Sequence, residues 1–330
     1  MRRLTRGILW IAGALAIGWS ALALYYASGL SPDWARLALA LAPPVAALIA
    51  AWRLRGRGAL IVVGVIFAGV LGWWLSIAPS NDRDWQPEVA KLAYATFDGD
   101  KVTIHNVRDF EYRTETDFTP RYIDRTVNLN DIRTIDVVSS YWSGELIAHL
   151  FLSFGFGDGE QIAVSIETRK EKTEEYSTLA GFFRQYEIVY VVATERDLIG
   201  VRTNHRRPPE DVYVYRTDAK PAGARQLFTD YLRAMNHLVE HPEFYNTLTT
   251  NCTTVIVMHT DAVRDVIPRS WKVLASGLFP EYLYELGYLD ESVPFRELKQ
   301  RAHVNARAQS AGAADDFSAQ IRAGTPVPKR

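Results

Sequence analysis

The chain has 330 residues, of which 48% are hydrophobic and 23% charged, and its formal net charge is −1. This composition excludes fibrous and fully disordered proteins, and the length predicts about two domains. The near-neutral balance hides two unlike parts, because residues 1–79 carry a net charge of +6 and the remaining 251 residues carry −7. Since the acidic second part lacks a basic run, a nucleic-acid partner is not expected.

Three apolar stretches fill the first part of the chain, at residues 8–28, 34–52 and 59–78. The first and third reach the length of about 20 residues that crosses a bilayer. The second contains Pro43-Pro44 and reaches this length only if Trp34 is included, with Arg36 at the interface. We therefore predict a membrane anchor over residues 1–79 with three transmembrane helices. The alternative is a second stretch that does not cross, which would reverse the orientation of the rest of the chain.

Arginines flank these stretches unevenly. Three precede the first stretch and three lie between the second and third, whereas residues 29–33 contain no positive charge. The positive-inside rule therefore places the N-terminus in the cytoplasm, and three spans place everything after residue 79 on the other side. The first stretch lacks a clear cleavage site, so we do not expect it to be a removed signal peptide. We predict a multi-pass protein of a bacterial inner membrane with its C-terminal part in the periplasm.

The second part mixes the patterns of strands and helices. Alternating or apolar runs predict strands at residues 101–106, 109–117, 147–154, 161–167, 187–194 and 212–216. Amphipathic spacing predicts a helix over 222–240, and a second helix is expected over 253–263. We therefore predict one α+β domain over residues 80–306. The Ala-, Ser- and Gly-rich residues 307–330 are expected to form a loosely ordered tail.

Cys252 is the only cysteine, which excludes an intramolecular disulfide and a cysteine-cluster metal site. It lies in Thr250-Asn251-Cys252-Thr253-Thr254, and either Thr250 or Asn251 is a good N-cap for the helix that follows. Cys252 then lies in the first turn, where free N–H groups and the helix dipole favour a thiolate. The alternative is a small buried hydrophobe, which is common for a free cysteine.

His149 is the histidine best placed to act as a base for this thiol. If Gly157-Asp158-Gly159 forms a three-residue hairpin loop, His149 faces Glu167 and Phe151 faces Ser165. A carboxylate opposite the imidazole can fix its tautomer and stabilise its charged form. A two-residue loop would remove this pairing. The alternative interpretation of His149 is a core or edge histidine.

Other polar motifs are expected to be structural. Residues 237–241 match the inverted zinc motif H-x-x-E-H, but at a helix end and without an evident third ligand, so we expect no metal and no cofactor. His259 follows Cys252 by seven residues, about 10 Å along a helix, and is expected at the surface or in packing. The charged residues 169–172 and 206–207 are expected on solvated faces.

Several segments resemble the Lnb N-terminal periplasmic domain family, in the same order: residues 106–113, 153–156, 165–171, 245–246 and 251–254. The resemblance covers residues 82–306. The order of histidine before cysteine, with Asn251-Cys252 opening a helix, is also similar to circularly permuted papain-like thiol enzymes of the NlpC and lecithin:retinol acyltransferase types. This similarity implies a papain-like fold with Cys252 as nucleophile and His149 as base. Those enzymes often carry a second histidine on the next strand, where this chain offers Ser165 or Glu167 as the third member.

The resemblance also implies a function, because Lnb-type proteins are associated with N-acylation of bacterial lipoproteins. We expect a membrane-anchored periplasmic thiol acyltransferase or hydrolase that forms a thioester on Cys252. Its partners would be the inner membrane and a lipid or lipoprotein substrate. The Cys252 backbone N–H and the Asn251 side chain are expected to stabilise the oxyanion. The alternatives are a cell-wall peptidase or amidase, and a non-catalytic envelope binding module in which Cys252 is buried.

Overall fold

The computed structural model describes residues 2–54, 56–262 and 267–328, and the chain divides into two compact units. The first unit comprises Met1–Asn81 together with two later segments, Glu175–Glu187 and Glu243–Thr247. The second comprises Asp82–Glu174, Ile188–Pro242 and Leu248–Arg330. This division corrects the predicted boundaries, because two internal segments of the predicted domain belong with the anchor, and the second unit extends to the end of the chain.

Three long helices form most of the first unit: α1 (Arg2–Ala27), α2 (Asp33–Leu54) and α3 (Arg57–Ser76). All three are long and apolar enough to cross a membrane, as the sequence predicted. Pro43 and Pro44 lie inside α2 without ending it. Membrane helices tolerate proline where neighbouring groups satisfy the freed backbone.

Aromatic packing and hydrogen bonds join the later segments of the first unit to α3. The Trp74 indole donates to the carbonyl of Phe183 at 3.2 Å. The Arg184 guanidinium donates to the carbonyls of Trp74 and Leu75, both at 3.1 Å, near the C-terminal end of α3. The last carbonyls of a helix lack partners within it, so Arg184 satisfies groups that α3 leaves open. Phe183 also stacks on Tyr26 of α1, with ring centroids 5.7 Å apart. These contacts explain why residues 175–187 belong with the anchor.

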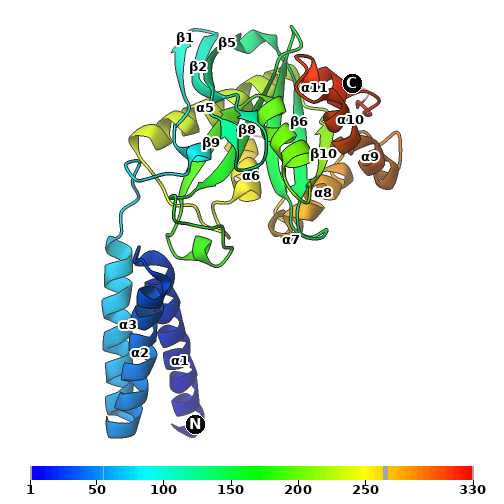
Figure 1. The fold of residues 1–330 in the computed structure, drawn as a ribbon. Helices are drawn as coiled ribbons and strands as arrows, with labels where there is room; N and C mark the ends of the chain where they lie inside the picture. Colours follow the sequence, from blue (N-terminus) through cyan, green and yellow to red (C-terminus); the bar gives the residue numbers. More distant parts are fainter. Residues whose placement is uncertain (1, 55, 263–266, 329–330) are drawn as a thin grey trace. The chain divides into compact units, whose positions relative to one another are not determined.

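A mixed sheet forms the centre of the second unit, with strand order β1-β2-β9-β8-β7-β6-β10 and β5 paired to β2 (Figure 1). Its strands are β1 (Tyr94–Asp98), β2 (Lys101–Arg108), β5 (Tyr122–Asn128), β6 (Ile132–Tyr141), β7 (His149–Phe156), β8 (Gln161–Arg169), β9 (Glu187–Ala193) and β10 (Asp211–Arg216). The short strands β3 (Glu111–Tyr112) and β4 (Phe118–Thr119) form a separate hairpin. Five of the predicted strands are confirmed, with ends shifted by a few residues. The predicted run 109–117 is wrong for most of its length, because it holds only the two-residue β3 and the turn that follows it. The strands β1, β5 and β6 were not predicted.

Helices cover both faces of this sheet. They are α4 (Glu195–Gly200), a π-turn η4 (Val201–His205), α5 (Pro221–Glu240), α6 (Cys252–Ala262), α7 (Trp271–Leu274), α8 (Phe279–Glu285), α9 (Phe295–Ala302), α10 (Asn305–Ala311) and α11 (Phe317–Ile321). Short 3-10 turns lie at η1 (Pro87–Val89), η2 (Leu129–Asp131), η3 (Ala180–Phe182) and η5 (Ser276–Leu278). Phe154 of β7 packs on Phe228 of α5, whereas Phe151 joins a core with Leu198 of α4 and Phe317 of α11. Because side chains alternate along a strand, α5 and α11 lie on opposite faces.

The tail is ordered, which corrects the prediction of loosely ordered residues at 307–330. Ala308 and Ile321 are fully buried, and α10 and α11 complete the core on the face of Phe151. The guanidinium of Arg322 pairs with two buried carboxylates, Asp136 at 2.7 Å and Glu195. The composition of this segment is that of a linker, but its small residues allow close packing of α10 and α11. The prediction failed because the carboxylates that pair with Arg322 lie far away in the sequence.

Candidate functional site

Cys252 is the first residue of α6, and Asn251 caps this helix. The Asn251 Oδ1 accepts from the backbone N–H groups of Thr253 and Thr254, both at 2.9 Å. The predicted helix start is thereby confirmed, and of the two predicted caps Asn251 is the one whose side chain accepts these bonds. The role of Asn251 visible in the structure is to hold the helix terminus beside the thiol.

The Cys252 thiol lies in a setting that favours its charged form. Burial opposes the thiolate, but a hydrogen bond from His149 and the charge of that ring outweigh it, so the pKa of Cys252 is lowered from its ordinary value. The backbone N–H of Leu150 also hydrogen-bonds the sulfur, and Thr253 Oγ1 lies 3.9 Å from it. Leu150 adjoins His149 on β7, so one strand supplies two of the groups that stabilise the thiolate. The hydrogen bond from the Leu150 backbone could not be predicted from the sequence, because any residue type supplies a backbone N–H.

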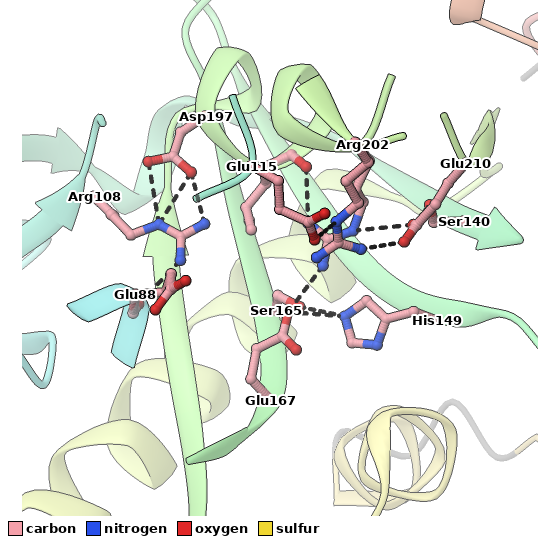
Figure 2. Close-up of polar contacts among 12 residues, drawn as sticks. Glu88, Arg108, Glu115, Ser140, His149, Ser165, Glu167, Asp197, Arg202 and Glu210 are labelled. Carbon is pink, nitrogen blue, oxygen red and sulfur yellow. Dashed lines mark hydrogen bonds and ion pairs between the residues drawn. The ribbon is translucent and has the colours of Figure 1, made fainter. Parts of the chain in front are cut away.

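The hairpin of β7 and β8 has the predicted register. Phe151 pairs with Ser165. The same register, continued by two residues along each strand, places His149 opposite Glu167. The His149 Nε2 lies 2.7 Å from Ser165 Oγ and 3.0 Å from Glu167 Oε1, and Ser165 Oγ donates to the same carboxylate oxygen at 2.7 Å (Figure 2). Both predicted third members therefore contact the imidazole.

The pKa values of this group follow from its charges. Burial of the His149 ring opposes its charged form, but the Glu167 carboxylate and the hydrogen bonds to Cys252 and Glu167 outweigh burial and raise the pKa of His149 to about 9. Burial likewise favours a neutral Glu167, yet the charges of His149 and Arg202 hold the pKa of this carboxyl well below its ordinary value. At neutral pH the group therefore favours a charged imidazole beside the Glu167 carboxylate, and the lowered pKa of Cys252 increases the thiolate fraction of its side chain.

Arg202 pairs with Glu167, a contact that the sequence did not predict. Its guanidinium donates to Glu167 Oε1 at 3.1 Å and to the carbonyl of Leu198 at 2.8 Å. It also forms an ion pair with Glu210 at 3.7 Å and covers the ring of Phe151 at 5.3 Å (Figure 2). One feature of the sequence could have indicated this role: Arg202 directly follows the apolar run 198–201. An arginine that is buried with such a run needs a charged partner.

Of the two settings expected for His259, the structure shows packing, because the side chain is buried and hydrogen-bonded rather than at the surface. Its Nε2 lies 2.6 Å from the hydroxyl of Tyr190 and its Nδ1 lies 2.7 Å from Asp230 Oδ2. Burial dominates and lowers the pKa of His259. The rings of His237 and His241 in the H-x-x-E-H segment lie 4.8 Å apart. Within residues 2–54, 56–262 and 267–328, no group of three or more metal-ligating side chains is placed to hold an ion.

An apolar cavity adjoins the elements that carry the site. It lies between β6, β7, α5, α6 and α8 and is open in part to solvent. Leu152 of β7 lines it two residues after Leu150, and Ile256 and Thr260 line it from α6. Since Ile256 and Thr260 follow Cys252 by one and two helical turns, the cavity begins about 6 Å along α6 from the thiol.

Residues 118–277 match the family model of the Lnb N-terminal periplasmic domain. This part of the chain therefore carries a Lnb N-terminal periplasmic domain. The match is shorter than the resemblance at residues 82–306, but it includes Cys252, His149, Glu167 and Asn251. No curated protein matches the chain, and no solved structure matches it. The protein thus combines a Lnb N-terminal periplasmic domain with three helices suited to a membrane.

Proposed function

We propose that this chain is a membrane-anchored thiol acyltransferase or hydrolase of the periplasm. One observation carries the proposal: the only cysteine begins a helix, hydrogen-bonds His149, and shares that histidine with the Glu167 carboxylate. A cysteine that only filled the core would need neither a lowered pKa nor a charged partner. The arrangement has the parts of a thiol nucleophile, a general base and a residue that orients the base.

The chemistry follows from these positions in two half-reactions. In the first, Cys252 Sγ bonds to the carbonyl carbon of an ester or amide, and the oxygen takes up the negative charge. The Cys252 backbone N–H stabilises this oxyanion, with the Asn251 side-chain amide as a second donor. As the bond to the leaving oxygen or nitrogen breaks, charged His149 gives that atom a proton and a thioester remains. In the second, water or an amine attacks the thioester, His149 accepts its proton, and Cys252 leaves as thiolate.

A lipid-linked substrate is favoured by the surroundings of the thiol. The cavity along α6 is lined mainly by aliphatic and aromatic side chains, among them Leu227, Ile256 and Phe279. An acyl chain bonded to Cys252 would fill this space without burying a polar group. The arginine distribution of the anchor supports a multi-pass inner-membrane protein with this domain in the periplasm. Lipoprotein N-acylation is the specific reaction that fits an acyl donor and an amine acceptor at such a surface.

Mass spectrometry of the Cys252 peptide tests the proposal directly. Full-length protein incubated with phospholipid vesicles should gain the mass of one acyl group on Cys252, and hydroxylamine should remove it, since it cleaves thioesters. The His149→Ala variant, incubated in the same way, should gain no such mass. If peptidoglycan fragments alone modify Cys252, the enzyme is a cell-wall peptidase or amidase. If no acyl donor modifies a folded protein, the domain is a binding module.

A further inference from the structure

Four large apolar side chains are exposed beside the site. Leu146 and Ile147 lie in the loop directly before His149 and are 61% and 51% exposed. Trp271 and Leu274 belong to α7 and are 65% and 56% exposed. We call these four residues the apolar rim. Single exposed apolar side chains are ordinary, but several gathered at one place mark an interaction surface.

Hydrogen bonds fix the two segments of the apolar rim against each other. The backbone N–H of Gly277, just after α7, donates to the carbonyl of Leu146 at 3.0 Å. The backbone N–H of Ala148 donates to Ser276 Oγ at 2.9 Å. Gly277 approaches the loop so closely that a Cβ there would lie 2.1 Å from the carbonyl oxygen of Glu145. The rim is therefore a preformed surface, held in place next to the strand that carries His149.

The charges around the apolar rim do not favour a charged partner. Lys272 of α7 is paired with Glu285 at 2.5 Å. The exposed side chains of Arg269 and Glu145 carry opposite charges. The surface therefore fits an apolar partner, and a tryptophan within it is typical of the boundary between lipid headgroups and acyl chains.

The chain itself keeps the second unit close to a bilayer. The helix α3, which is suited to a membrane, ends at Ser76, and Trp85 already pairs with Glu171 inside the second unit. Nine residue steps reach at most about 30 Å when fully extended. A bilayer that contains α3 would therefore offer an apolar surface within about 30 Å of Trp85.

We propose that the apolar rim inserts into the headgroup boundary of the bilayer that holds the three helices. Insertion would bring the loop that directly precedes His149 to the lipid surface. The proposal does not depend on catalysis, because it concerns exposed side chains and the tether rather than the reactivity of Cys252.

Fluorescence quenching in proteoliposomes tests this inference. Full-length protein with Cys252→Ser receives one new cysteine, Trp271→Cys, which is labelled with an environment-sensitive fluorophore. The matched control is Phe97→Cys, because Phe97 is 41% exposed and lies on β1, at the opposite edge of the sheet from β6 and β10. Vesicles consist of phosphatidylcholine with or without bromine on the acyl chains. We expect blue-shifted emission and severalfold stronger bromine quenching at position 271 than at position 97.

Two results would overturn the proposal. Equal, weak quenching at both positions would show that the apolar rim stays in water. Blue-shifted emission at position 271 without bromine quenching would show that protein rather than lipid covers it. A further variant distinguishes insertion driven by the apolar rim from insertion driven by the fluorophore. In labelled protein that also carries Leu146→Asp and Leu274→Asp, bromine quenching at position 271 should fall towards the value at position 97. Unchanged quenching would mean that the fluorophore alone drives insertion.

Discussion

Replacing Glu167 with Gln tests whether Cys252 and His149 form an ion pair. The substitution keeps the size of the side chain but removes the charge that raises the pKa of His149 to about 9. Relative to the ordinary value of 6.5, this shift corresponds to about 3 kcal/mol in favour of the charged imidazole. Without the carboxylate most of this stabilisation is lost, while burial still opposes the charge. Near pH 7.5, His149 should be almost fully charged in the wild type and largely neutral in the variant.

Alkylation by iodoacetamide reports this change, because Cys252 is the only cysteine and its side chain is partly accessible. Wild-type protein should react with a midpoint below the ordinary thiol pKa of 9.0. The midpoint should move upward in Glu167→Gln and further in His149→Ala, which removes the hydrogen bond as well as the charge. His105→Ala is the matched control, since His105 also contacts a carboxylate, Asp124 at 2.8 Å, but outside the site.

The pH dependence of turnover should agree with the alkylation. His149 must carry a proton to release the leaving group, so turnover should fall as pH rises through about 9. In Glu167→Gln this alkaline limit should move to lower pH, because the pKa of His149 falls. A wild-type thiol that titrates like a free cysteine, or an unchanged midpoint in Glu167→Gln, would refute the ion pair. Alkylation only after unfolding would favour the buried-hydrophobe interpretation of Cys252.

Three further predictions concern the thiol, the tail and the membrane. Cys252→Ala should abolish substrate turnover while circular dichroism stays unchanged, and chelators should have no effect; activity in this variant would exclude the thiol mechanism. Arg322→Ala should lower the free energy of unfolding in urea by about 3–5 kcal/mol, because it removes the ion pair of the buried Glu195 and leaves the buried Asp136 with Arg216 alone. Arg301→Ala, which breaks an exposed helical pair, should cost less than about 1 kcal/mol, and equal effects would contradict the structural role of the tail. A periplasm-specific reporter fused after Arg330 should be active, and an inactive but well-expressed fusion would contradict the three-span topology.

The sequence alone determined the features that depend on local pattern. Uninterrupted apolar length identified the three membrane-suited helices, since a span is defined by composition over about 20 residues. The Gly157–Gly159 turn set the register of β7 and β8, because hairpin loop length fixes which residues face each other. That register brought His149 opposite Glu167. The Asn251 cap likewise located the start of α6 and placed Cys252 in its first turn.

Only the tertiary structure decided which charged residues are buried. Arg169 belongs to a charged run that was expected on a solvated face, yet it is 2% exposed, donates to the Val89 carbonyl and covers the ring of Trp85. Arg202 supports Glu167 through a contact between residues 35 positions apart. The burial of a charge depends on whether a distant partner meets it, and local periodicity carries no record of that meeting.

The same reason explains the missed strand and the tail. β6 pairs with both β7 and β10, one strand in from the edge of the sheet, but its sequence, IRTIDVVSSY, mixes polar with apolar residues. Its Asp136 is buried because Arg216 and Arg322 reach it from later parts of the chain. The ordered tail depends on this long-range pairing and on close packing of its small residues, neither of which composition records. Local sequence thus determined where Cys252 and His149 lie, whereas the charged groups that surround them were determined by the fold.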